Sequence, residues 1–195
     1  MAFSLAVKGE RLQRIPYIAM LKENNVRKGF VEPSQLEAIR HHLPAYAQAP
    51  ITFSYVTGWR LRSETLRLQW RQVDFKAGVV TLDPGTTKSG HGRTFPLTAD
   101  LRALLDFQRE TTAKVQRMKG IVVPWVFHKN GRQMKGVRKV WRKAATAAGL
   151  PGLIPHDLRR SCVRNLKRAG VPRSTAMALV GHKDASDLFA LCGDR

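Results

Sequence analysis

The sequence predicts an α+β fold that is mainly helical: a helical bundle with a small three-stranded antiparallel sheet. Apolar residues recur at three- and four-residue spacing over much of the chain, as they do on helices that bury one face. Between residues 73 and 97 this spacing gives way to three short runs rich in β-branched and aromatic residues, which are typical of strands joined by turns. With 195 residues, 43% of them hydrophobic, the chain is long enough for one domain with a core.

The pattern of the chain changes near residue 33. Residues 1–32 are basic, mixed in pattern and interrupted by proline and glycine, so we expect an arm or linker with at most short local structure. Pro33 then suits the first turn of a helix, and apolar residues follow at helical spacing: Leu36, Ile39 and Leu43. The folded domain is therefore expected to span residues 33–195.

The middle of the chain contains the predicted sheet. A second apolar stretch spans residues 51–56, and Gly58 marks a break before another helical segment at 63–70. Three short strands are expected after it, at 73–75, 79–82 and 93–97. Because only turns separate them, they are expected to pair as antiparallel neighbours.

The remainder of the chain is predicted to be helical. Thr98 caps a helix that carries four apolar residues at helical spacing: Leu101, Leu104, Leu105 and Phe107. A turn at Asn130-Gly131 follows an apolar stretch that a proline interrupts. Three further helices are expected, at 134–148, 157–169 and 172–180.

The charge of the chain indicates a polyanionic partner. Thirty-four Lys and Arg residues against fourteen Asp and Glu residues give a formal net charge of +20, and nucleic acid is the first candidate. A membrane partner is not expected, because the basic residues are spread along the chain and no apolar run approaches the roughly 20 residues of a membrane span.

The two cysteines suggest neither a disulfide scaffold nor a metal site. Cys162 and Cys192 show no CxxC or Cys/His ligand spacing. The apolar stretch before Lys8 is too short for a signal peptide. We therefore expect a reducing, cytoplasmic setting.

Two segments in the first half of the chain carry candidate functional residues. In the first, Arg60 follows a helix-breaking glycine, and Glu64 lies one helical turn further on. Taken alone, this pair fits an ordinary surface ion pair. In the second, Lys88 lies in a basic, glycine-rich hairpin tip at residues 86–93, which suits either solvated charge or contact with a DNA backbone.

Two segments in the second half carry the remaining candidates. His156 and Arg159 are three residues apart on one predicted helix, so they share a face. A separate apolar stripe is expected to face the core, and it consists of Leu158, Cys162, Leu166 and Ala169. His156 and Arg159 are therefore both expected to project toward a groove or solvent. His182 follows a helix-ending glycine, a position that fits either a packing histidine or a catalytic one.

The order Arg, Lys, His-x-x-Arg, His, with a hairpin around the lysine, resembles the catalytic domain of the tyrosine recombinase (phage integrase) family. The matching stretches are TGWRLRSE at 57–64, TKSGHGRTFPL at 87–97, HDLRR at 156–160 and LVGH at 179–182. The resemblance runs from about Phe30 to Lys183. It implies that family's fold and double-stranded DNA as the partner. It leaves open whether the chain associates with itself on DNA.

The resemblance assigns catalytic roles to five residues: Arg60, Lys88, His156, Arg159 and His182. Attack on a phosphodiester builds negative charge on the non-bridging oxygens, which the two arginines would clamp. The histidines would supply hydrogen bonds and acid or base help, and the lysine would protonate the leaving 5′ oxygen. Glu64 would orient the first arginine. Because a 3′-phosphotyrosyl bond conserves the energy, no metal or other cofactor is implied.

The sequence departs from the family at two places. The interval from Arg60 to Glu64 is one residue longer than usual, which leaves Arg62 as an alternative for the first clamp position. The family places its nucleophilic tyrosine about nine residues after the last histidine, where this chain has Leu191. Tyr17, Tyr46 and Tyr55 are the three tyrosines, and all precede Arg60.

The missing tyrosine predicts a site-specific recombinase catalytic domain that is defective in strand cleavage and whose C-terminal tail is incomplete. Ser186 and Cys192 are chemically capable of attack, but neither lies where the clamp would present it. The alternative is a DNA-binding remnant, or a competitor at recombination sites, without chemistry. An RNA- or ribosome-associated protein would explain the charge but not the ordered catalytic set.

Overall fold

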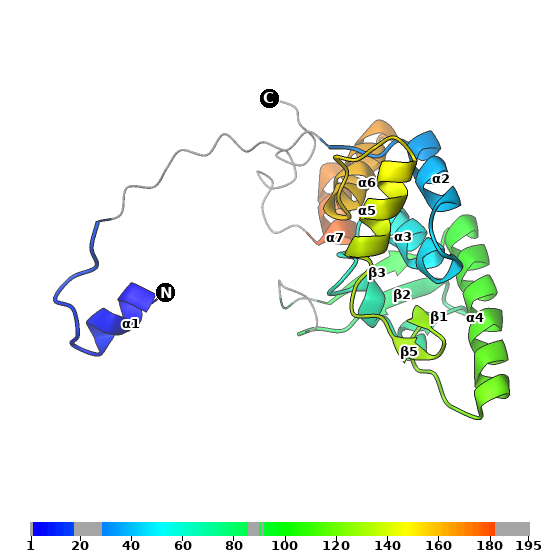
Figure 1. Ribbon diagram of the computed structural model, residues 1–195, viewed down its shortest axis with the longest axis horizontal. Helices are drawn as coiled ribbons and strands as arrows, with labels where there is room; N and C mark the ends of the chain where they lie inside the picture. Colours follow the sequence, from blue (N-terminus) through cyan, green and yellow to red (C-terminus); the bar gives the residue numbers. More distant parts are fainter. Residues whose placement is uncertain (1, 18–28, 86–89, 91, 182–195) are drawn as a thin grey trace.

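The computed structural model describes residues 2–17, 29–85, 90 and 92–181 (Figure 1). Its α-helices are α1 Ala2–Lys8, α2 Pro33–His41, α3 Ala45–Thr57, α4 Ala99–Lys119, α5 Arg138–Ala147, α6 His156–Arg168 and α7 Arg173–Val180. Its strands are β1 Val73–Asp74, β2 Val79–Leu82, β3 Arg93–Pro96, β4 His128–Lys129 and β5 Arg132–Gln133, and two 3-10 turns are η1 Thr65–Arg67 and η2 Trp70–Gln72. The prediction of a mainly helical α+β fold is confirmed.

Helix α3 lies at the centre of the helical layer. It packs against α6 on one side and α4 on another, while α2 packs on α5 and α7 on α6. Most residues of its second half are buried, since it is surrounded by other elements. Phe53 in α3 contacts the rings of Trp59 and Phe127, with ring centroids 5.6 and 5.3 Å apart. The core that the described residues form draws no side chain from α1.

The sheet has the predicted three antiparallel strands, in the order β1-β2-β3. Val80 in β2 lies opposite Val73 on one side and Phe95 on the other. Alternate residues of β3 are buried, because successive side chains of a strand point to opposite faces. Phe95 and Arg93 therefore share the inward face, and this places an arginine beneath the sheet.

The helix predicted at 63–70 is wrong. The chain there forms turns and the two short 3-10 turns instead. Leu66 and Leu68 are both fully buried although they are two residues apart, which a helix stripe does not allow. The backbone from Leu68 pairs with the segment 124–126 instead: Val126 N–H donates to the Leu68 carbonyl, and Trp70 N–H donates to the Pro124 carbonyl, both at 2.9 Å.

The turn at Asn130-Gly131 is confirmed, but it joins a second, two-stranded sheet that the sequence did not predict. Strands β4 and β5 pair there, and Asn130 and Gly131 have φ of 53° and 85°, as the tight hairpin turn requires. Each strand has only two residues, too few for an alternating pattern to be visible in a sequence. The last helices match their predictions closely, except that α5 begins four residues later than expected.

Residues 29–32, which the sequence places in the arm, lie against α6. Val31 is fully buried, and its N–H donates to Ser161 Oγ at 2.7 Å. Glu32 pairs with Arg164, whose guanidinium also lies 4.1 Å from the centroid of the Phe30 ring. Within the described residues, the packed part of the chain therefore includes residues that precede Pro33. Across the residues that the structure describes, no helix is both long and apolar enough to cross a membrane.

Candidate functional site

The carboxylate of Glu64 is the centre of a buried cluster of charges. Helix α3 ends at Gly58, and the tight turn after it brings the Glu64 side chain back over Arg60. Arg60 donates to Glu64 twice, from its backbone N–H to Oε2 at 2.7 Å and from Nη1 to Oε1 at 2.9 Å. Arg93 Nη2 forms an ion pair with the same carboxylate. We call Arg60, Arg93 and Arg159, together with Glu64, the arginine cluster.

Glu64 is ionised in spite of its burial. Its side chain has no exposed surface, and burial alone would raise its pKa. The cation of Arg93 and the hydrogen bonds from Arg60 outweigh that effect, so the pKa of Glu64 is lowered from its ordinary value. A fixed negative charge thus holds two guanidinium groups in place.

Arg93 links the root of the hairpin to the end of α7. It is the first residue of β3, and its Nη1 donates to the Val180 carbonyl at 2.6 Å. Its guanidinium also lies 5.7 Å from the centroid of the Trp59 ring. Gly181, which ends α7 with φ of 76°, passes so close that a Cβ there would lie 1.5 Å from Arg93 Nη1. The site therefore depends on the absence of a side chain at position 181.

Arg159 in the first turn of α6 is buried, which corrects the prediction that it projects toward a groove or solvent. Only 2% of its surface is exposed. Nη1 donates to the Gly58 carbonyl at 2.8 Å and Nη2 to the Gly181 carbonyl at 3.4 Å. The close packing of α3 and α7 on α6 turns the side chain inward. The stripe expected to face the core does so in Leu158 and Cys162 and partly in Leu166, but the prediction is wrong for Ala169, which is exposed just after the end of α6.

The C-terminal ends of two helices stabilise the buried cations. The carbonyls that accept from Arg159 and Arg93 belong to the last residues of α3 and α7 or directly follow them, where helix carbonyls lack partners within the helix. Those ends also carry the negative pole of the helix dipole. The pKa of Arg159 is nevertheless lowered to about 9, mainly by burial and secondly by the neighbouring cation of Arg60. Because this value lies above 7, the side chain stays protonated at neutral pH.

His156 opens α6 beside the cluster and is exposed. Its pKa is lowered, first because part of the ring is removed from water and then because Arg159 and Arg60 repel a proton. The ring is therefore neutral at pH 7, with one nitrogen able to donate and the other able to accept.

Four of the residues predicted from the sequence thus lie together: Arg60, Glu64, His156 and Arg159. Of the two arginines weighed for the first clamp position, Arg60 is the one bound to Glu64, and Arg62 is exposed. Lys88, His182 and Leu191 lie outside the described residues. So do Ser186 and Cys192.

Arg93 is the site residue that the sequence did not single out. Its signal is its position in β3, where a basic residue occupies the same inward face as Phe95. An inward-facing charge on a strand requires a buried partner, and the partner of Arg93 is Glu64.

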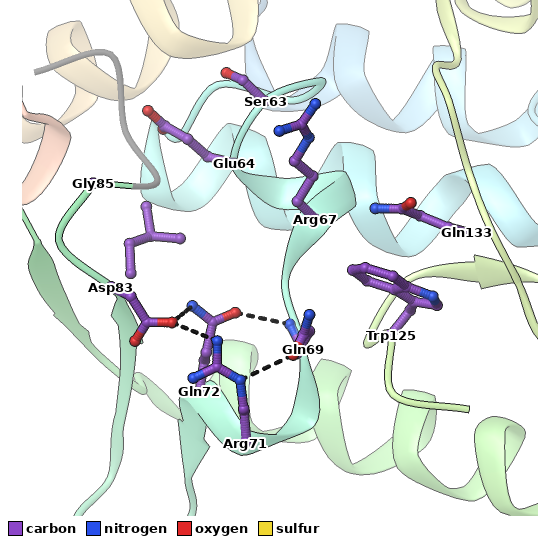
Figure 2. A pocket seen from close by; sticks show the side chains of 11 residues that line it. Ser63, Glu64, Arg67, Gln69, Arg71, Gln72, Asp83, Gly85, Trp125 and Gln133 are labelled. Carbon is purple, nitrogen blue, oxygen red and sulfur yellow. Dashed lines mark hydrogen bonds and ion pairs between the residues drawn. The ribbon is translucent and has the colours of Figure 1, made fainter. Parts of the chain in front are cut away.

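A polar cavity of about 510 Å³ borders the cluster at Glu64 (Figure 2). Its lining comes from the turns after α3, the end of β2, the start of the hairpin and the second sheet: Ser63, Glu64, Arg67, Gln69, Arg71, Gln72, Leu82, Asp83, Gly85, Trp125 and Gln133. Arg71 and Gln72 both donate to Asp83, and Gln69 bonds to each of them. Figure 2 shows this hydrogen-bonded ring at one end of the cavity and Arg67 with Ser63 at the other.

Comparison with known proteins places these features in context. The model of the phage integrase family matches residues 29–188. An integrase of Salmonella phage P22 is 26% identical over 185 residues, which are 87% of this chain and 45% of that protein. The prophage integrase IntF of Escherichia coli K12 is 28% identical over 155 residues, 78% of this chain and 32% of that protein. The chain thus spans less than half the length of these curated relatives.

A solved structure shares the fold. The integrase of the Tn1549 transposon, determined in complex with circular intermediate DNA, has a TM-score of 0.74 with 18% sequence identity, over 97% of this chain and 70% of that one. At this identity the likeness establishes the arrangement of helices and strands.

Proposed function

Because the chain belongs to the phage integrase family, whose members are tyrosine recombinases, we propose that it is a site-specific recombinase or integrase catalytic domain that binds double-stranded DNA. In this proposal the arginine cluster binds the phosphodiester that is cut. The observation that carries this proposal is the convergence of Arg60, Arg159 and His156 beside a buried carboxylate.

The chemistry proposed for the cluster is the recognition and polarisation of a phosphate. Two guanidinium groups held in advance can neutralise the charge that develops on the non-bridging oxygens, with little reorganisation during the reaction. Glu64 and the helix carbonyls fix those groups, so the positive charge is in place before DNA binds. Neutral His156 can donate a hydrogen bond to the same phosphate. Lys88 and His182 are proposed to complete the set from the adjacent segments.

The 195 residues contain no tyrosine suited to attack. Tyr17 is 94% exposed in the N-terminal segment. Tyr55 is buried in α3, where its hydroxyl accepts from Asn165 Nδ2 at 3.0 Å, and burial raises its pKa. Tyr46 is also in α3, and its ring packs against Lys129 of β4, whose Nζ lies 4.7 Å from the ring centroid. We propose that this polypeptide binds DNA but does not by itself form a 3′-phosphotyrosyl bond, and a role as a non-catalytic competitor for recombination sites is the second candidate.

Binding is tested first. A fluorescently labelled duplex is titrated with the purified chain between about 50 and 200 mM salt, and affinity is expected to fall steeply as phosphate contacts release counterions. Arg159→Lys, which keeps the charge but loses the planar two-carbonyl geometry, should bind more weakly. Affinity that does not change over this salt range would rule out the DNA-binding proposal.

Cleavage is tested with a suicide substrate that traps a covalent adduct. The unaltered chain should form none. Replacement of residues 184–195 by a family-like tail that includes Leu191→Tyr should restore some adduct, and Lys88→Ala in that chain should slow its formation. Leu191→Tyr alone should do little, because the surrounding residues also differ from the family pattern. An adduct formed by the unaltered chain would show that the nucleophile lies elsewhere in it.

A further inference from the structure

Building on the proposed DNA-binding function, we propose that the polar cavity is a second phosphate site, in which Arg67 holds a backbone phosphate of the same DNA next to the one bound by the arginine cluster. Of the residues that line this cavity, the catalytic scheme above uses only Glu64. Three of its lining residues, Ser63, Glu64 and Arg67, lie in the compact turn that begins at Arg60 of the cluster.

Arg67 supplies the charge. It is exposed at the end of η1, and within the part of the chain that the structure describes its side chain makes no hydrogen bond or ion pair. Its backbone is well held, because Thr65 and Leu66 in the same turn are buried and Thr65 Oγ1 bonds to Ser54 Oγ at 2.8 Å. A guanidinium on a fixed base, with all its donors available, is suited to an anion that arrives from outside.

The other charges around the cavity are already compensated. Asp83 accepts from Arg71 at 2.7 Å and from Gln72 at 3.1 Å, so this carboxylate and this cation neutralise each other. The carboxylate of Glu64 has no exposed surface and is held by two arginines of the cluster. Among the residues that the structure describes, the charge left to face the cavity is therefore that of Arg67, and the site favours an anion.

The neutral donors in the cavity match a phosphodiester. Ser63 and Gln133 line it together with Arg67, and Figure 2 shows the three side chains on the same side, away from the ring that contains Asp83. Arginine, serine and glutamine side chains are among the groups that bind phosphate oxygens in protein–DNA complexes. Trp125 offers an aromatic wall rather than a further charge.

The position of the cavity favours a DNA backbone over a free anion. The first residue of the turn, Arg60, belongs to the cluster, and the last, Arg67, belongs to the cavity. Gly85, where the described part of the predicted lysine hairpin ends, borders the cavity as well. A backbone lying across the cluster would therefore continue past Arg67, and each additional phosphate contact adds to affinity without adding sequence preference.

The test compares salt dependence in four versions of the full chain: the unaltered protein, Arg67→Ala, Arg67→Lys and Arg117→Ala. Arg117 is a matched control, because it is an exposed arginine on α4 that does not line the cavity. Arg67→Ala should weaken duplex binding at low salt and reduce the slope of log affinity against log salt by about one. Arg67→Lys should restore most of the slope. Thermal unfolding should be the same for all variants, since Arg67 supports no other residue.

Each alternative result has a distinct meaning. If the unaltered chain shows no salt-dependent binding, the proposed function itself fails. If it binds as expected but Arg67→Ala keeps the full slope, the DNA contact of the cluster stands and the second phosphate site is refuted. Equal losses in Arg67→Ala and Arg117→Ala would also refute it, because they would show a general effect of net charge rather than a contact in the cavity.

Discussion

The arginine cluster and the polar cavity meet at Glu64 but use arginine in opposite ways. In the cluster, Arg159 and Arg93 are almost fully buried and donate to a carboxylate or to helix-end carbonyls. In the cavity, Arg67 is exposed and Arg71 is paired with Asp83. The first region fixes cations before a ligand arrives, whereas the second presents a cation that only a ligand would fix.

This difference predicts which changes act on the fold and which act on the proposed DNA binding alone. A buried ion network is costly to break, because the remaining partner is left charged and away from water. An exposed cation contributes little to the stability of the fold. Its main effect is on the binding of an anion, and salt weakens that interaction. The cluster should therefore respond to substitution in unfolding experiments, and the cavity only in binding experiments.

The largest expected effect is that of Glu64→Gln. The change leaves Arg60 and Arg93 without their shared anion, and we expect a loss of about 3–5 kcal/mol in the free energy of unfolding at neutral pH, measured by denaturant titration. Glu37→Gln is the matched control, since Glu37 is an exposed carboxylate paired with Arg40, and it should cost less than about 1 kcal/mol. A similar small loss for both variants would show that Glu64 does not stabilise the cluster.

The same carboxylate should make stability depend on acid. Because the pKa of Glu64 is lowered in the folded protein, its contribution is fully present above the ordinary value of about 4.3 and is lost as pH falls through the folded value. The difference in unfolding free energy between the unaltered chain and Glu64→Gln should therefore shrink below about pH 4. A difference that stays constant down to pH 3 would contradict this assignment.

A smaller effect is expected from Gly181→Ala. The new Cβ would overlap Arg93 Nη1 and force it away from the Val180 carbonyl, in addition to the strain of an alanine at positive φ. Together we expect roughly 3 kcal/mol, from about 1–2 for the backbone and 1.5–3 for the hydrogen bond. Gly120→Ala is the control: it ends α4 with φ of 62°, a Cβ there meets nothing within 4 Å, and only the backbone strain should remain.

The arginine cluster and the polar cavity also differ in how far they could be predicted from the sequence. Three of the four cluster residues, Arg60, Glu64 and Arg159, lie in motifs that resemble a known family, so they could be named in advance together with the neighbouring His156. Arg93 was not singled out. The environment of Arg159 could not be predicted, because the stripe of apolar residues on α6 shows which face meets the core but not how α3 and α7 close over the first turn.

The cavity had no sequence signal at all. Residues 63–70 were predicted to be helical, and a helix there would have placed Arg67 elsewhere. Leu66 and Leu68 are both buried because the backbone after η1 pairs with residues 124–126, a contact between segments more than fifty residues apart. Local patterns do not contain such pairings, and therefore neither the turn nor the cavity that it lines was predictable.

Arg60→Ala should separate folding from binding within the cluster. The Arg60 side chain is 28% exposed, so its ion pair with Glu64 is partly screened and its loss should cost about 1 kcal/mol of stability. Loss of a direct contact to a bound phosphate should lower duplex affinity about tenfold or more at low salt. Arg62→Ala, a neighbouring exposed arginine, should lower it less. A larger loss for Arg62→Ala than for Arg60→Ala would indicate that Arg62 occupies the clamp position, and equal losses would show a general effect of net charge.

The smallest expected effect is a shift in the titration of His156, measured by NMR of its ring protons. In the free protein the midpoint should lie below the ordinary histidine value of about 6.5, since partial removal from water and the cations of Arg159 and Arg60 disfavour its protonated form. Arg60→Ala should raise the midpoint, because one of those cations is removed.

Addition of a short duplex should raise the midpoint of His156 as well, and by more, because a phosphate between the arginines offsets their charge and favours the protonated ring. Folded His156 holds its proton less tightly than the unfolded chain does, so its contribution to stability is present above about pH 6.5 and is lost as pH falls below it. The Arg67→Ala chain should show the same shift on DNA binding once saturated, since the cavity contacts a different phosphate. If DNA raised the midpoint in the unaltered chain but not in saturated Arg67→Ala, the cavity and the cluster would be binding one phosphate together, and the division between the two regions would fail.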